Sequence, residues 1–234
     1  MSVRKFVRPY KQNKVCVSPS VLDLDLANFK NEIRNMDQIG IRSVHIDVMD
    51  GKFVKNSSQG NTFLRKIPSN SKLYKDVHIM VANPYSKVEK YKNAGTNCLT
   101  FHYEAYKYKK RVIETIYKIK NAGMKVGISI KPSTPISEIV PLLPLVDRVL
   151  LMSVEPGLGG QKFMESSYDR IAELKKAIRK TKSKALISVD GGINDVTGPK
   201  CLKSGASILV SGKYLFKGNP DNKELKDRYE RLVK

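Results

Sequence analysis

The chain has 234 residues, of which 41% are hydrophobic and 28% are charged, and 43 Lys and Arg against 22 Asp and Glu give a net charge of +21. This length predicts one large core rather than two large domains. No apolar run approaches the ~20 residues that span a bilayer, and the N-terminal residues lack the apolar core of a secretory signal. The sequence therefore predicts neither a membrane protein nor an exported one.

The three cysteines, Cys16, Cys98 and Cys201, are odd in number and widely spaced, without a C-x-x-C pair. This pattern predicts reduced thiols in a soluble, cytoplasmic protein rather than disulfides or a zinc knuckle.

The basic residues are densest in residues 4–14, 107–111 and 175–184. Residues 1–14 are interpreted as a basic extension ahead of a single domain of residues 15–234. The excess charge attracts phosphorylated small molecules and polyanions alike. We favour a solvated basic surface, with nucleic-acid binding as the alternative.

Short runs rich in β-branched residues alternate with helical patterns along the chain. Strands are predicted at residues 15–17, 43–48, 72–80, 97–102, 125–130, 148–152, 185–189 and 207–210. Helices are predicted at residues 24–38, 84–93, 108–121, 136–143, 166–180 and 195–203, with a short one near 62–65.

Eight such units, at roughly 29 residues each, fit a (β/α)8 TIM barrel. A doubly wound sheet is the rival fold, but the first strand is not followed by G-x-G-x-x-G, and no G-x-x-x-x-G-K-[ST] occurs. In such barrels the chemistry lies at the carboxyl ends of the strands.

Polar side chains occupy three of these strand ends. With a period of two, His45, Asp47 and Met49 share the inward face of the second strand. His78 ends the third strand and Asp190 the seventh. Two imidazoles and two carboxylates suit one divalent metal ion, Zn²⁺ first, with Fe²⁺, Mn²⁺ or Co²⁺ possible, rather than Ca²⁺. His102 also ends a strand, but no acidic residue is in phase with it there, so we expect a satisfied or pocket-lining histidine.

Glycine-rich loops follow the last three predicted strands: P-G-L-G-G-Q at residues 156–161, D-G-G-I at 190–193 and V-S-G-K at 210–213. Glycine lets backbone N–H groups approach an anion, and the loops after the last strands of barrels commonly bind phosphate. The sequence therefore predicts a metal ion beside a phosphate site.

Five segments carry a resemblance to a known family: S-P-S-V-L (18–22), H-I-D-V-M-D-G-K-F-V (45–54), D-V-H-I-M-V-A-N-P (76–84), L-L-M-S-V-E-P-G-L-G-G-Q-K-F (150–163) and V-D-G-G-I (189–193). Together they closely resemble ribulose-phosphate 3-epimerases, collinearly over roughly residues 15–216. The resemblance implies a (β/α)8 barrel that interconverts D-ribulose 5-phosphate and D-xylulose 5-phosphate in the pentose phosphate pathway.

The resemblance also implies roles for individual residues. The metal ligands would be His45, Asp47, His78 and Asp190, and the two aspartates would be the catalytic acid and base. The substrate-binding residues would be Ser20, Met49, His78, Met80, Met152, Gly157, Leu158, Gly159, Gly160, Gly191, Gly192, Gly212 and Lys213.

The sequence departs from the family pattern at two site loops. F-V-K-N-S-S-Q-G (53–60) lacks a proline and an apolar residue usual after the second strand, and Lys213 replaces a hydroxyl residue. A changed loop leaves an allulose-6-phosphate 3-epimerase open as an alternative substrate assignment. A nucleic-acid-binding protein on an inherited barrel is the alternative from another class. We also expect a homo-oligomer.

Overall fold

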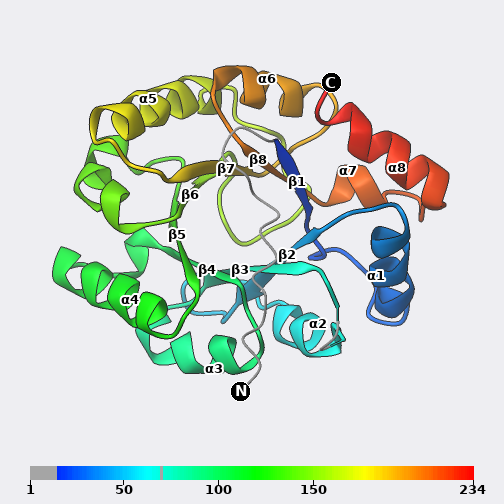
Figure 1. The fold of residues 1–234 in the computed structure, drawn as a ribbon, viewed down its shortest axis with the longest axis horizontal. Coiled ribbons are helices and arrows are strands. Elements are labelled where there is room, and N and C mark those ends of the chain that lie inside the picture. The colour runs from blue at the N-terminus through cyan, green and yellow to red at the C-terminus, as the bar shows by residue number, and fades with distance from the viewer. Residues whose placement is uncertain (1–14, 69–70) are drawn as a thin grey trace.

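A computed structural model describes residues 15–68 and 71–234. Eight parallel strands pair in the order β1-β8-β7-β6-β5-β4-β3-β2. A parallel bridge between Ser20 and His45 joins the two ends of this sheet, and Val21 N–H donates to His45 O at 3.1 Å. The strands form a ring surrounded by helices, so the predicted (β/α)8 barrel is confirmed (Figure 1).

The strands are short, as expected for a compact barrel. Their bounds are β1 Cys16–Pro19, β2 Ser43–Met49, β3 Tyr74–Met80, β4 Cys98–His102, β5 Lys125–Ile130, β6 Arg148–Met152, β7 Leu186–Asp190 and β8 Ile208–Ser211. The α-helices are α1 Phe29–Gln38, α2 Gly60–Lys66, α3 Val88–Asn93, α4 Lys109–Asn121, α5 Ser167–Lys180, α6 Thr197–Ser204, α7 Lys213–Phe216 and α8 Asn222–Arg231. The 3-10 helices are η1 Pro84–Lys87, η2 Tyr103–Ala105, η3 Ile136–Glu138 and η4 Val140–Leu145.

Two helical predictions need correction, and two helices were missed. The first helix begins at Phe29, five residues later than predicted. The predicted helix at 136–143 is instead the pair η3 and η4, because Pro141 and Pro144 have no N–H for an α-helical ladder. Helices α7 and α8 were not predicted, although Asp221 caps α8 by accepting a hydrogen bond from Glu224 N–H at 2.8 Å.

Successive side chains along a strand point alternately into the barrel and toward the surrounding helices, so the protein has an inner and an outer core. On β2, Val44, Ile46 and Val48 are buried in the large cluster between the strands and the helices. His45 and Asp47, on the other face, point into the barrel, where they are equally buried. The barrel interior is therefore polar at the level of the site, while the surrounding layer is apolar and supplies the hydrophobic stabilisation.

Cys16, Cys98 and Cys201 are free thiols, and the last two are buried. Among residues 15–68 and 71–234, no helix has both the length and the apolar character needed to cross a bilayer. The basic extension at residues 1–14 lies outside the described residues.

Candidate active site

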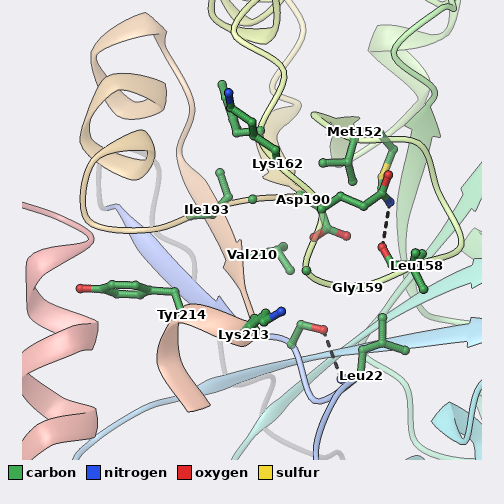
Figure 2. A pocket seen from close by; sticks show the side chains of 18 of the residues that line it. Leu22, Met152, Leu158, Gly159, Lys162, Asp190, Ile193, Val210, Lys213 and Tyr214 are labelled. Atoms are coloured by element: carbon green, nitrogen blue, oxygen red, sulfur yellow. Dashed lines mark hydrogen bonds between the residues drawn. The ribbon is translucent and has the colours of Figure 1, made fainter. Parts of the chain in front are cut away.

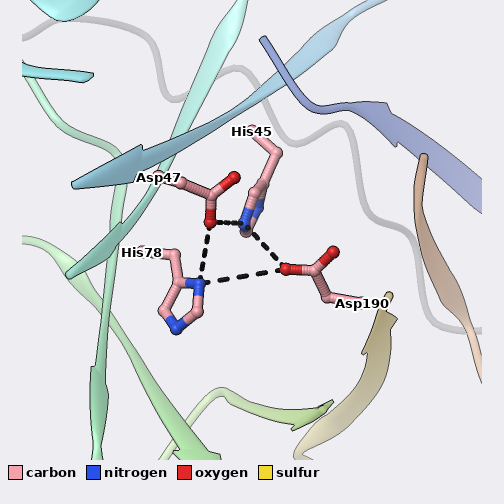
Figure 3. A group of neighbouring side chains, drawn as sticks. All are labelled: His45, Asp47, His78 and Asp190. Atoms are coloured by element: carbon pink, nitrogen blue, oxygen red, sulfur yellow. Dashed lines mark hydrogen bonds and ion pairs between the residues drawn. The ribbon is translucent and has the colours of Figure 1, made fainter. Parts of the chain in front are cut away.

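Three strand ends bring the four predicted metal ligands together inside the barrel. One ligand atom from each of His45, Asp47, His78 and Asp190 lies within 4.8 Å of the others. Asp47 Oδ1 is 3.2 Å from His45 Nε2 and 3.0 Å from His78 Nδ1. Asp190 Oδ2 is 3.7 Å and 3.9 Å from the same two nitrogens. The four side chains converge on one point (Figure 3).

Burial and mutual charge set the protonation of this cluster. Burial alone would raise the pKa of Asp47, but His45 and His78 outweigh it and hold that pKa well below its usual value. Burial and the nearby Asp47 carboxylate raise the pKa of Asp190 to about 6. Burial opposes a charge on His45, yet the carboxylates of Asp47 and Asp76 raise its pKa well above the usual value. The pKa of Asp47 is thus lowered and that of Asp190 is raised.

This donor set fits a divalent cation. Two imidazole nitrogens and two carboxylate oxygens, buried and within reach of one point, match Zn²⁺ and its first-row neighbours better than the all-oxygen shell of Ca²⁺. Buried carboxylates are costly unless they are paired or bound to a metal, and two of them converge here.

The buried ion pair of Asp76 and Arg148 holds the Nδ1 side of His45. His45 Nδ1–H donates to Asp76 Oδ2 at 2.9 Å, and Arg148 donates to the same oxygen. The guanidinium of Arg148 and His45 lower the pKa of Asp76 against the effect of its burial. Neither Asp76 nor Arg148 was predicted as part of the site. The signal for Asp76 was its position two residues before His78, which places it on the same inward face of β3.

A second chain of contacts leads away from His78. His78 Nε2 lies 2.9 Å from His102 Nε2, and His102 Nδ1 lies 3.1 Å from Glu104 Oε2. Burial is the main cause that lowers the pKa of His102 to about 4. Burial works to raise the pKa of Glu104, but hydrogen bonds from His102, Thr134 and the backbone of Lys131 lower it to about 2. His102 is the satisfied histidine that the sequence predicted; Glu104, just beyond the strand, was missed.

The remaining predicted residues surround one pocket of about 500 Å³ above the cluster. Met49, Met80 and Met152 line it next to Asp47 and Asp190, as do all the predicted glycines, Leu158 and Lys213. Ser20 also lines it and donates from Oγ to Asp47 Oδ2 at 2.9 Å. Figure 2 shows Asp190, Gly159 and Lys213 around this pocket.

Two glycines at the pocket have left-handed backbone that a side chain would strain. Gly192 has φ +64°, and a Cβ there would lie 2.5 Å from Phe163 N. Gly160 has φ +71°, and a Cβ would meet the Lys213 side chain at 3.0 Å. The left-handed backbone favours glycine at both positions, and the close approach of the Phe163 backbone requires it at Gly192. The backbone of Gly160 and Gly192 therefore borders the pocket without a side chain, and Lys213 lines the same pocket.

The altered loop after β2 remains attached to the site by polar contacts. Ser58 Oγ donates to Asp47 O at 2.8 Å and accepts from Met49 N–H at 3.0 Å. Asn56 Nδ2 donates to Gly157 O at 2.8 Å, which ties this loop to the glycine loop after β6. The loop is therefore held against the glycine loop after β6 without the usual proline.

Comparison with known proteins gives the same picture. The profile of the Ribulose-phosphate 3 epimerase family matches residues 16–216. The ribulose-phosphate 3-epimerase of Bacillus subtilis is 39% identical over 209 residues, covering 89% of this chain and 94% of that protein. The cytoplasmic isoform from Oryza sativa is 37% identical over 203 residues, covering 86% of each. The chain belongs to the ribulose-phosphate 3-epimerase family. It is therefore an epimerase, and the predicted enzyme class is confirmed.

Solved structures support the fold. A mutant tryptophan synthase alpha-subunit from Pyrococcus furiosus superposes with a TM-score of 0.70 at 15% identity, covering 94% of this chain and 98% of that one. The 3-hexulose-6-phosphate synthase of Salmonella typhimurium gives a TM-score of 0.63 at 14% identity, covering 93% and 99%. At these identities the likeness concerns the barrel alone.

Proposed function

We propose that this epimerase is metal-dependent and interconverts D-ribulose 5-phosphate and D-xylulose 5-phosphate by removing and returning the proton at C3 through an enediolate. The observation that carries the proposal is the group of two imidazoles and two carboxylates on three strand ends, facing a glycine-lined pocket. The names of the related proteins support the choice of substrate.

The cation would be held by His45, Asp47, His78 and Asp190, whose donor atoms already converge. When bound, it would stabilise the negative charge that develops on the substrate oxygens next to C3. Zn²⁺ is the proposed ion, and Fe²⁺, Mn²⁺ and Co²⁺ are compatible with the same donors.

Asp47 and Asp190 supply the acid and the base. They extend from β2 and β7, which are separated by β1 and β8 in the sheet, so they approach the pocket from different sides. Inversion at C3 requires one aspartate, as a carboxylate, to take the proton on one face and the other, as a carboxylic acid, to return a proton on the opposite face. In the reverse reaction the two exchange roles. Ser20 Oγ, hydrogen-bonded to Asp47 Oδ2, keeps that carboxylate turned toward the pocket.

The rest of the pocket would orient and shield the substrate. Buried Met49, Met80 and Met152 exclude water and offer no competing acid. At the other end, the backbone of Gly191, Gly192 and Gly212 and the ammonium of Lys213 would bind the phosphate. This would hold C3 between the two aspartates.

The test is a metal-replete epimerase assay with D-ribulose 5-phosphate and allulose 6-phosphate as parallel substrates. We expect kcat/KM to favour the pentulose phosphate, chelation to abolish activity, and Zn²⁺ or Co²⁺ to restore it far better than Ca²⁺. A preference for the hexulose phosphate would overturn the substrate assignment. Full activity in protein that elemental analysis shows to be metal-free would overturn the metal centre. The homo-oligomer and the cytoplasmic location stay predictions, checked by light scattering and by fractionation.

A further inference from the structure

The inference concerns the side of His78 that faces away from the cluster. His78 Nδ1 lies 3.0 Å from Asp47 Oδ1, whereas His78 Nε2 lies 2.9 Å from His102 Nε2. Two imidazole nitrogens at this distance share one hydrogen: one ring donates and the other accepts. The direction of that bond decides whether His78 presents a lone pair or a hydrogen to the cluster.

Glu104 sets the direction. Its Oε1 accepts hydrogen bonds from Lys131 N–H at 2.8 Å and from Thr134 Oγ1, and its Oε2 is 3.1 Å from His102 Nδ1. An ionised carboxylate only accepts, so His102 Nδ1 must carry the hydrogen. His102 Nε2 then accepts from His78 Nε2–H. In the neutral imidazole of His78 the lone pair is therefore on Nδ1, the nitrogen that faces Asp47 and Asp190 and that a cation would bind.

We propose that His102 and Glu104 are positioning residues that hold His78 in the tautomer able to bind a cation; this rests on the metal centre proposed above. His45 has a corresponding arrangement, because its Nδ1–H donates directly to Asp76 Oδ2 at 2.9 Å. Each imidazole of the cluster is thus backed by a carboxylate, one directly and one through a second histidine. Such outer partners fix ring orientation and raise ligand basicity.

The surroundings keep this chain of hydrogen bonds rigid and dry. His102 is completely buried, and the Phe53 ring packs against it at a tilt of 38° with ring centroids 4.8 Å apart. Arg170 Nη2 donates to Lys131 O at 3.0 Å and to Thr134 O at 2.6 Å. The donors that fix Glu104 are themselves fixed from α5, so the carboxylate is held in one orientation.

Glu104→Gln gives a sharp test because it keeps the shape and changes one hydrogen. The backbone N–H of Lys131 requires an acceptor, so the amide oxygen takes the Oε1 position and the NH₂ group faces His102 Nδ1. The chain then reverses: His102 Nε2–H donates to His78 Nε2, and His78 Nδ1 turns a hydrogen toward the cluster. Zn²⁺ affinity should fall by about 10- to 100-fold, the usual effect of losing an outer partner.

Histidine-specific ¹⁵N NMR reads the tautomers directly, because the chain has only three histidines and all three belong to this site. In the Zn²⁺-loaded wild type we expect hydrogen on His78 Nε2 and on His102 Nδ1. In metal-free Glu104→Gln we expect it on His102 Nε2. Zn²⁺ affinity is measured in parallel by competition with a chromophoric chelator.

Two further variants separate positioning from general structure. Glu138→Gln is the matched control, since Glu138 accepts from Tyr103 Oη in the same region but does not contact the chain of histidines. His102→Gln should restore affinity relative to His102→Leu, because its amide can accept from His78 and donate to Glu104. These variants also cover the case in which Glu104→Gln fails to fold.

The outcomes distinguish the two proposals. Hydrogen on His102 Nε2 in the Zn²⁺-loaded wild type, or Zn²⁺ affinities of Glu104→Gln and His102→Leu equal to that of Glu138→Gln, would overturn the positioning role alone. A wild type that binds no Zn²⁺ at the cluster would overturn the proposed metal centre and the positioning role with it. Reversal of the tautomer together with a selective loss of affinity would establish the role.

Discussion

Arg148→Met is expected to destabilise the protein by about 3–5 kcal/mol, the typical cost of removing one partner of a buried ion pair. Arg148 begins β6, its side chain is 3% exposed, and its guanidinium donates to the completely buried Asp76. Methionine fills a similar volume but cannot donate to the Asp76 carboxylate. That carboxylate then keeps its hydrogen bond from His45 and loses the one from Arg148. Against a typical total stability of about 5–15 kcal/mol, this loss is large.

A double variant tests the cause of the loss. Asp76→Asn removes the carboxylate charge but keeps an oxygen that can accept from His45 Nδ1–H. If the cost comes from an uncompensated buried charge, Arg148→Met/Asp76→Asn will be more stable than Arg148→Met alone. The single variant should also bind Zn²⁺ more weakly, because an unpaired Asp76 favours protonation of His45, and a protonated imidazole cannot bind a cation.

Urea unfolding at several pH values measures the effect. Arg148 lowers the folded-state pKa of Asp76 below its ordinary 3.8, so the stabilisation is present above about pH 4. It is lost as the pH falls through the lower folded-state value, and the difference between wild type and Arg148→Met should shrink there. A loss below about 1 kcal/mol at neutral pH, or a double variant as unstable as the sum of the single ones, would refute the reasoning.

Two further predictions concern the reaction and the surface charge. Asp47→Asn and Asp190→Asn should each lower kcat by at least about 10²-fold with unfolding curves near wild type, because each removes a proton-transfer group. Metal content is measured beside the rate, and near-normal turnover in either folded variant would contradict the roles. Deleting residues 1–14 should leave epimerase activity intact, and rising salt should lower kcat/KM only mildly, since a small dianion releases few counterions. Tight, steeply salt-dependent binding of single-stranded nucleic acid that the deletion abolishes would instead support the alternative function.

Local patterns in the sequence predicted both the barrel and the group of candidate metal ligands inside it, because both depend on features within single strands. The period of two along a strand decides which side chains point inward, and His45, Asp47 and His78 could be placed on that face from the sequence alone. The position of Asp190 followed from the end of a single strand. Each of these predictions uses information from a single strand only.

The supporting residues were missed because they depend on relations between strands. Asp76 pairs with Arg148, 72 residues later and three strands around the sheet, so no local pattern connects them. Glu104 lies in η2, just past the end of β4, where strand alternation no longer applies. Helix α8 was missed for a different reason: its sequence is strongly polar and only Leu225 within it is buried, so it offers few apolar residues on which to base a prediction.

The charges inside the barrel contrast with those of the whole chain. The chain carries +21, yet the site gathers four buried or largely buried carboxylates, Asp47, Asp190, Asp76 and Glu104, of which Asp76 pairs with the buried guanidinium of Arg148. Such an excess of buried negative charge is costly in a low-dielectric interior unless protons or a cation compensate it. A divalent ion at the cluster would neutralise most of the excess. Substitutions at Asp76, Arg148 and Glu104 should therefore change cation affinity even though none of these residues is a proposed ligand.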